Sequence, residues 1–121
     1  MVSINKRTSM ALFSDAGDHY CQRVRIVLEE KGISSEIIDV DKNKLNDEIL
    51  EVSPYGTLPV LVDRDVALYD SVTLMEYLDE RFPHPPLLPV YPVSRANMRL
   101  YIKRINNDWC SLFDSLVSGK L

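Results

Sequence analysis

The sequence of 121 residues has few cysteines, no excess of basic residues and no long apolar run. Cys21 and Cys110 are its two cysteines, too few for the disulfide framework of a small secreted domain. No apolar stretch approaches the roughly 20 residues that a membrane span requires. The first residues lack the pattern of a signal peptide. We therefore expect a cytoplasmic protein that has no contact with a membrane.

Positive charge is also limited, because 14 Lys and Arg residues stand against 18 Asp and Glu residues, for a net charge of −4. The basic residues form three small groups near acidic residues: Lys6-Arg7, Arg23 with Arg25, and Arg99 with Lys103 and Arg104. A protein that binds nucleic acid needs a basic stripe that displaces phosphate counterions. Direct binding of DNA or RNA is therefore not expected, and a role in transcription would act through a protein.

The first 82 residues alternate between strand-like and helix-like patterns. Apolar runs predict strands at Thr8–Phe13, Ile33–Val40, Leu58–Val62 and Val66–Tyr69, and helical spacing predicts helices at 18–31, 46–52 and 71–81. The alternation at the front predicts a parallel strand pair with a crossover helix, and Asp63-Arg64-Asp65 predicts a β-hairpin behind it. This βαβαββα order is the thioredoxin arrangement of an α/β protein.

Polar residues mark the predicted helix ends. Asp18 is a good N-cap for the first helix, and Gly32 follows its last turn, where glycine commonly ends a helix. Asp70-Ser71 is expected to cap the third helix in the same way. Cys21 lies at helical spacing from apolar residues of the first helix, so we expect it in the core.

Residues 83–121 differ in character from the front part. Residues 83–92 are rich in proline, which cannot continue a helix, so they predict a stiff connector. A long helix is predicted from Val93, as the start of an incomplete helical domain at 93–121. Its apolar stripe consists of Met98, Tyr101, Ile102, Ile105, Trp109, Leu112, Phe113 and Leu116. Such a stripe needs cover, so either a further domain or another copy of the chain should bury it.

Three segments resemble the cytosolic glutathione-transferase superfamily: Val24–Gly32 (VRIVLEEKG), Pro54–Asp63 (PYGTLPVLVD) and Tyr69–Phe82 (YDSVTLMEYLDERF). The resemblance implies a thioredoxin-like domain of the transferase N-terminal type over residues 1–82, followed by the first helix of an all-α domain. It also implies a cis peptide bond before Pro59. In dimers of this superfamily the early helices of the second domain lie near the twofold axis, so a homodimer is expected.

Two segments resemble a narrower group within the superfamily whose members associate with RNA polymerase: Tyr77–Tyr91 (YLDERFPHPPLLPVY) and Asn5–Ser14 (NKRTSMALFS). This resemblance implies a non-catalytic protein that binds RNA polymerase and its sigma factor and regulates transcription under starvation or acid stress. The alternative is a glutathione transferase or another glutathione-dependent thiol enzyme.

The segment Asp18-His19-Tyr20-Cys21 separates these alternatives. In the cysteine and serine transferases the first residue of the corresponding four-residue segment carries the reactive group. Asp18, the first residue here, has neither a thiol nor a hydroxyl. Cys21 aligns with the inner, shielded position, where a cysteine usually acts as a small hydrophobic residue rather than a redox thiol. Tyr20 and Ser14 are the weaker candidates for activating a glutathione sulfur. No catalytic residue is therefore assigned.

Four further positions match the part of the family's site that holds glutathione. A cis Pro59 would expose the backbone of Leu58 to an extended peptide, and Asp70-Ser71 could hold a carboxylate at a helix N-terminus. The family has glutamate where Asp70 stands, one methylene longer. With Asp18 these positions are read as a vestigial glutathione site, and no cofactor is expected apart from weak binding of glutathione. His and Cys spacing does not fit a zinc site, so no metal is expected.

The proline-rich segment is the candidate for binding a protein partner. Pro83, His84, Pro85, Pro86 and Tyr91 form the predicted docking surface. Rigid prolines lose little entropy on binding, and histidine and tyrosine offer amphipathic contacts. The alternative interpretation of the segment is a stiff connector between domains.

Overall fold

The computed structural model describes residues 9–119, so Thr8, the first residue of the predicted first strand, lies outside the described residues. The chain divides into two compact units, and the division falls between Pro85 and Pro86, inside the predicted connector. Each unit is described by itself.

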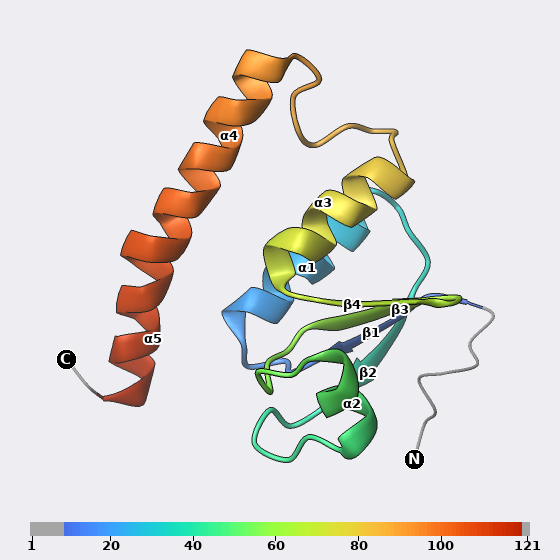
Figure 1. Ribbon diagram of the computed structural model, residues 1–121, viewed down its shortest axis with the longest axis vertical. Helices are drawn as coiled ribbons and strands as arrows, with labels where there is room; N and C mark the ends of the chain where they lie inside the picture. Colours follow the sequence, from blue (N-terminus) through green and yellow to red (C-terminus); the bar gives the residue numbers. More distant parts are fainter. Residues whose placement is uncertain (1–8, 120–121) are drawn as a thin grey trace. The chain divides into compact units, whose positions relative to one another are not determined.

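The first unit contains a four-stranded mixed sheet with the strand order β2-β1-β3-β4 (Figure 1). The strands are β1 (Ala11–Ser14), β2 (Glu36–Asp39), β3 (Val60–Asp63) and β4 (Val66–Tyr69). β1 runs parallel to β2 and antiparallel to β3, and β3 and β4 form an antiparallel hairpin. The predicted thioredoxin-like fold is confirmed by this topology and by the order of the helices between the strands.

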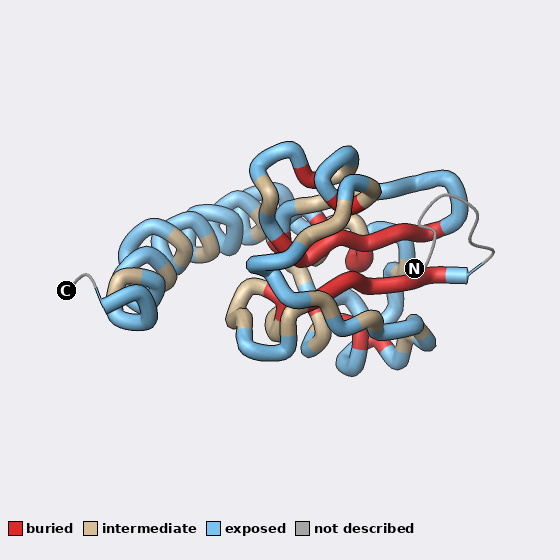
Figure 2. The backbone as a smooth tube through the Cα atoms, turned by 90° about the horizontal axis from the view of Figure 1, so that it is seen from below, coloured by how far each residue is buried: buried red, intermediate tan, exposed pale blue. Residues whose placement is uncertain are grey.

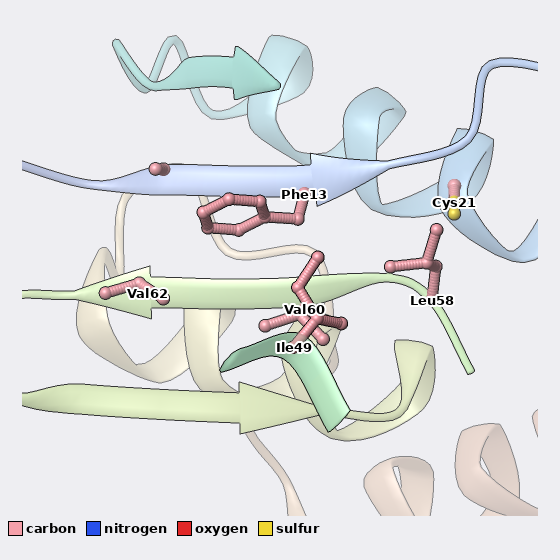
Figure 3. Packing of buried hydrophobic residues seen from close by; sticks show 7 residues of the cluster. Phe13, Cys21, Ile49, Leu58, Val60 and Val62 are labelled. Carbon is pink, nitrogen blue, oxygen red and sulfur yellow. The ribbon is translucent and has the colours of Figure 1, made fainter. Parts of the chain in front are cut away.

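Three helices cover the sheet: α1 (His19–Glu30), α2 (Asp47–Val52) and α3 (Ser71–Arg81). Helices α1 and α3 lie together on one face, where their apolar residues pack against β1 and β3. This cluster consists of Met10, Leu12, Val24, Leu28, Leu61, Leu74 and Leu78. Helix α2 covers the other face through Ile49, which packs with Phe13, Val60 and Cys21 (Figure 3). The sheet is therefore buried on both faces, as in a two-sided α/β core.

The helix ends agree with the signals in the sequence. Asp18 is the N-cap of α1, and Gly32 adopts a positive φ of 63° after the last turn, which favours glycine. Asp70 is the N-cap of α3, whereas Ser71 is its first helical residue. The predicted bounds of α3 are confirmed at both ends.

Three strands begin later than predicted. β1 begins at Ala11, after Ser9 and Met10, and ends at Ser14, one residue beyond the prediction. The N–H of Ile33 bonds to the carbonyl of Leu28 and so completes the end of α1, which delays the start of β2 to Glu36. β3 begins at Val60 because Pro59 before it has no N–H for the ladder. The peptide bond between Leu58 and Pro59 is cis, as predicted.

Residues 92–118 of the second unit form a continuous helical rod: α4 (Pro92–Arg104), the π-helical segment η1 (Ile105–Cys110) and α5 (Ser111–Ser118). It begins one residue before the predicted Val93, because proline is well suited to the first helical position. The π-helical segment has no counterpart in the sequence prediction. Figure 2 shows this rod as exposed or intermediate along its length, and Trp109 is 74% exposed. No helix within residues 9–119 is both long and apolar enough to cross a membrane.

Candidate functional site

Asp18 stands at the N-terminus of α1, where the thioredoxin fold places its reactive residue. Its carboxylate accepts a hydrogen bond from the N–H of Cys21 at 3.0 Å, so it satisfies one of the free donors of the first turn. The Lys42 ammonium lies 3.7 Å from the other carboxylate oxygen. The helix dipole stabilises an anion at this position. Asp18 therefore acts as a structural cap, and it offers neither a thiol nor a hydroxyl.

Cys21 lies one turn further along α1 and is fully buried. Figure 3 shows its sulfur in the cluster that also contains Leu58 and Val60. Burial raises the pKa of the Cys21 thiol to about 12, and the neighbouring Asp15 N–H, which donates to the sulfur at 3.4 Å, only partly offsets that effect. A thiol in this state supplies almost no thiolate at neutral pH, which agrees with the prediction of a core cysteine.

The two weaker candidates for sulfur activation lie in different surroundings. The Tyr20 ring stacks against His19, with ring centroids 4.0 Å apart, and the Arg23 guanidinium lies 4.9 Å from the centroid of the same tyrosine ring. Ser14 ends β1, is fully buried, and its hydroxyl has no hydrogen-bond partner within the described part of the chain. The contacts of Tyr20 thus involve its ring, whereas the Ser14 hydroxyl is buried.

Two of the positions predicted to form a vestigial glutathione site, Asp70 and Ser71, lie at the N-terminus of α3. The Asp70 carboxylate accepts hydrogen bonds from the N–H and the hydroxyl of Thr73, at 3.1 and 2.8 Å. Asp70 has a φ of 77°, which residues other than glycine rarely adopt. The Ser71 hydroxyl accepts from the Arg23 guanidinium, with Nε at 3.0 Å and Nη2 as a second donor. Both side chains are therefore already engaged within the chain.

A separate open pocket of about 720 Å³ lies beside this helix end. It is lined by Val52, Tyr55, Thr57, Ala67, Leu68, Tyr69, Asp70 and Thr73. Asp18, Pro59 and Ser71 do not line it. Among the positions predicted for glutathione, Asp70 lines this pocket, and the Arg23–Ser71 contact links α1 to α3.

The predicted docking surface is exposed at each of its five residues. Pro83, His84, Pro85 and Pro86 follow the end of α3 without regular secondary structure, and Tyr91, which precedes α4, is 79% exposed. The peptide bond between His84 and Pro85 is cis, a feature that the sequence analysis did not include.

Lys31 is a residue of this region that the sequence analysis missed. Its side chain is fully buried, and its ammonium lies 2.6 Å from a carboxylate oxygen of Asp79. It also donates to the carbonyl oxygens of Phe82 at 2.5 Å and Pro85 at 2.8 Å. A lysine beside a glycine at the end of an amphipathic helix usually faces solvent, so its position in the sequence gave no signal of this role.

Within residues 9–119, His, Cys, Asp and Glu side chains form no group of three or more that could hold a metal ion.

Comparison with known proteins places these observations in a family. A family model described as "Glutathione S-transferase, N-terminal domain" matches residues 12–86. A relative from Haemophilus ducreyi named "Stringent starvation protein A homolog" is 54% identical over 93% of this chain and 53% of its own length. A "Probable glutathione transferase" from Aplysia californica is 42% identical over 68% of this chain and 89% of its own length.

The solved structures show the same fold. Glutathione transferase Omega 3C from Trametes versicolor matches with a TM-score of 0.80 and 30% identity, over 93% of this chain and 52% of that one.

Five relatives named stringent starvation protein A homolog are 52–58% identical to the chain. The chain spans about half the length of those relatives.

Proposed function

This chain belongs to the glutathione S-transferase family, and we propose that within it the protein is a non-catalytic cytoplasmic regulator that binds RNA polymerase. Its partner is RNA polymerase with its sigma factor, and its role is the regulation of transcription under starvation or acid stress. The identity of 52–58% to relatives named for stringent starvation supports this proposal.

The observation that carries the non-catalytic part is the state of the α1 N-terminus. A transferase of this fold needs a thiol, serine or tyrosine there that contacts the glutathione sulfur. Here a carboxylate caps the helix, and the nearby thiol of Cys21 is buried with its pKa raised to about 12. A carboxylate at this position would also repel a glutathione thiolate by like charge.

The observation that supports docking is the exposed, proline-rich surface from Pro83 to Pro86 with Tyr91. The core of the first unit does not contain these side chains, so packing does not explain their chemistry. Interface energy usually concentrates in a few anchors, each worth about 2 kcal/mol or more. A histidine between prolines, with a tyrosine nearby in the sequence, can supply such anchors on a stiff backbone.

The test is a pull-down of polymerase subunits from a bacterial lysate. Replacing Pro83, His84 and Pro85 together with alanine should abolish recovery of polymerase and leave the melting curve near wild type. The fold should tolerate this change because the three side chains are exposed, and because Lys31 bonds to backbone carbonyls that alanine retains. Pro54→Ala, at an exposed turn of the same unit, is the matched control and should bind normally. If the triple variant still recovers polymerase normally, the segment is a connector and the proposed docking surface is wrong.

The second candidate function is glutathione conjugation, favoured by the thioredoxin-like topology and by a relative named as a probable glutathione transferase. An assay with glutathione and a generic electrophile separates the two. The wild type should show no meaningful turnover, whereas Asp18→Ser or Asp18→Cys should gain weak glutathione binding because the repelling charge is removed. Robust turnover by the wild type would favour the transferase.

The proposal includes a homodimer. The apolar residues of the helical rod remain largely exposed in the single chain, with Trp109, Phe113 and Leu116 at 74, 48 and 58%. An exposed apolar face of this kind is rare in monomers. Sedimentation should therefore show a dimer, and a well-behaved monomer of 13.9 kDa would contradict this part of the proposal.

A further inference from the structure

Lys31 has surroundings that are unusual for a lysine. It follows the last turn of α1, and its side chain is fully buried although its charge favours water. Lysine is almost never fully buried without a partner, because moving an ammonium out of water is unfavourable unless acceptors replace the water. The residues around Lys31 must therefore provide acceptors for its ammonium group.

The ammonium has three N–H donors, and three acceptors lie within hydrogen-bonding distance. They are a carboxylate oxygen of Asp79 at 2.6 Å, the carbonyl of Phe82 at 2.5 Å and the carbonyl of Pro85 at 2.8 Å. The two carbonyls flank Pro83 and His84 on either side. Asp79, on α3, provides the charge that accompanies the lysine into the interior.

The segment itself can do little to fix its own shape. Pro83, Pro85 and Pro86 have no N–H, so the segment cannot form a backbone ladder or a helical turn of its own. The N–H of Phe82 is already bonded to Leu78 in α3. Its shape therefore depends on donors from elsewhere in the chain, and Lys31 supplies two of them.

Lys31 and His84 also line one open pocket, of about 340 Å³, together with Arg81 and Phe82. The lysine is thus close beneath the proposed docking surface. A neighbouring contact of α3 includes none of the carbonyls that Lys31 binds: the Tyr77 hydroxyl donates to Asp63, which lines the same pocket, at 2.7 Å. This second polar contact provides a comparison within the same helix.

We propose that Lys31 is a positioning residue for the docking surface. By binding the carbonyls on both sides of Pro83 and His84, it holds these residues in one shape before a partner arrives. A segment that is already ordered loses less entropy on binding, so its affinity is higher. This inference rests on the proposed function, since it concerns how the polymerase-binding segment is presented.

The test uses the double variant Lys31→Met with Asp79→Asn, in the full chain. Methionine retains the apolar stem, asparagine retains the shape of the carboxylate, and no unpaired buried charge is left behind. Tyr77→Phe is the matched control, because it removes a polar interaction between α3 and β3 near the same pocket and none of the hydrogen bonds to the Phe82 and Pro85 carbonyls. Two quantities are measured: the affinity for purified RNA polymerase, and the ¹⁵N order parameter of the His84 amide, which is the only N–H between Pro83 and Pro86.

We expect the order parameter of His84 to fall from about 0.85 to below about 0.6 in the double variant. The affinity for polymerase should fall at least about tenfold. Tyr77→Phe should leave both quantities near wild type even where it lowers the melting temperature. A merely structural role of Lys31 would change the melting temperature and would not change the His84 order parameter.

The outcomes separate this inference from the proposed function. If the double variant binds polymerase normally, or if the His84 amide stays rigid, Lys31 is not a positioning residue. If the Pro83, His84 and Pro85 alanine variant also binds normally, the docking surface itself is wrong. In that case the order parameter alone still shows whether Lys31 fixes the segment.

Discussion

The raised pKa of Cys21 leads to a sharp prediction about its reactivity. The thiolate is the reactive form of cysteine, and at neutral pH a thiol with a pKa of about 12 carries about a thousandth of the thiolate of one at the ordinary 9.0. The sulfur is also fully buried. In the folded protein Cys21 should therefore react with a disulfide reagent at least about a thousandfold more slowly than an accessible cysteine.

The assay uses a Cys110→Ser variant, in which Cys21 is the remaining thiol. Release of the coloured thiolate from an aromatic disulfide reagent gives the rate at neutral pH. The same variant in urea is the control, and there Cys21 should react at the rate of an unfolded peptide. A folded-state rate within about tenfold of the urea rate would refute the burial argument and would favour a thiol enzyme.

The same pKa shift affects stability at alkaline pH. The folded-state pKa is raised above the unfolded value, so this contribution to stability is fully present below pH 9.0 and is lost as the pH rises toward about 12. Between pH 8 and pH 10 the wild type should lose about 1.4 kcal/mol of unfolding free energy relative to Cys21→Ala. Denaturant unfolding of both proteins, under reducing conditions, measures this difference, which a normal thiol would leave constant.

Two further predictions concern the stability of the first unit. Asp18→Ala should lower the unfolding free energy by about 1 kcal/mol, because the Cys21 N–H loses its cap. Asp18→Ser should stay within a few tenths of a kcal/mol of the wild type. Equal stabilities of Asp18→Ala and the wild type in denaturant would contradict the capping role. Leu78→Ala should cost about 2–5 kcal/mol because it opens a cavity between α3 and the sheet, and a loss below about 1 kcal/mol in the same measurement would show that the site collapses.

Features with a local cause could be predicted from the sequence. Asp18 and Gly32 bound α1 through a cap and a positive φ, and both signals lie within a few residues of the helix. The bounds of α3 followed in the same way from Asp70 and the proline after Phe82. The parallel pairing of β1 with β2 and the hairpin of β3 and β4 followed from the alternation of elements, since few topologies satisfy the rules for parallel crossovers.

Features that depend on distant residues could not be predicted. Lys31 is buried because Asp79 and the carbonyls of Phe82 and Pro85 meet it in the folded chain, and nothing near position 31 indicates this. The Arg23–Ser71 contact likewise joins residues 48 positions apart. For this reason the sequence indicated the positions of the vestigial site, whereas only the structure shows that Asp70 and Ser71 are engaged within the chain.

The run of prolines after α3 also limits how a partner can recognise it. From Pro83 to Pro86 the backbone has four carbonyl oxygens and a single N–H, that of His84. A partner strand cannot pair with such a segment, because β-augmentation requires donors and acceptors on both sides. Even though the carbonyl of Pro85 is bonded to Lys31, the backbone of this segment presents mainly hydrogen-bond acceptors. A protein that reads this backbone must therefore bring the hydrogen-bond donors itself, for example from arginine, asparagine or a helix N-terminus.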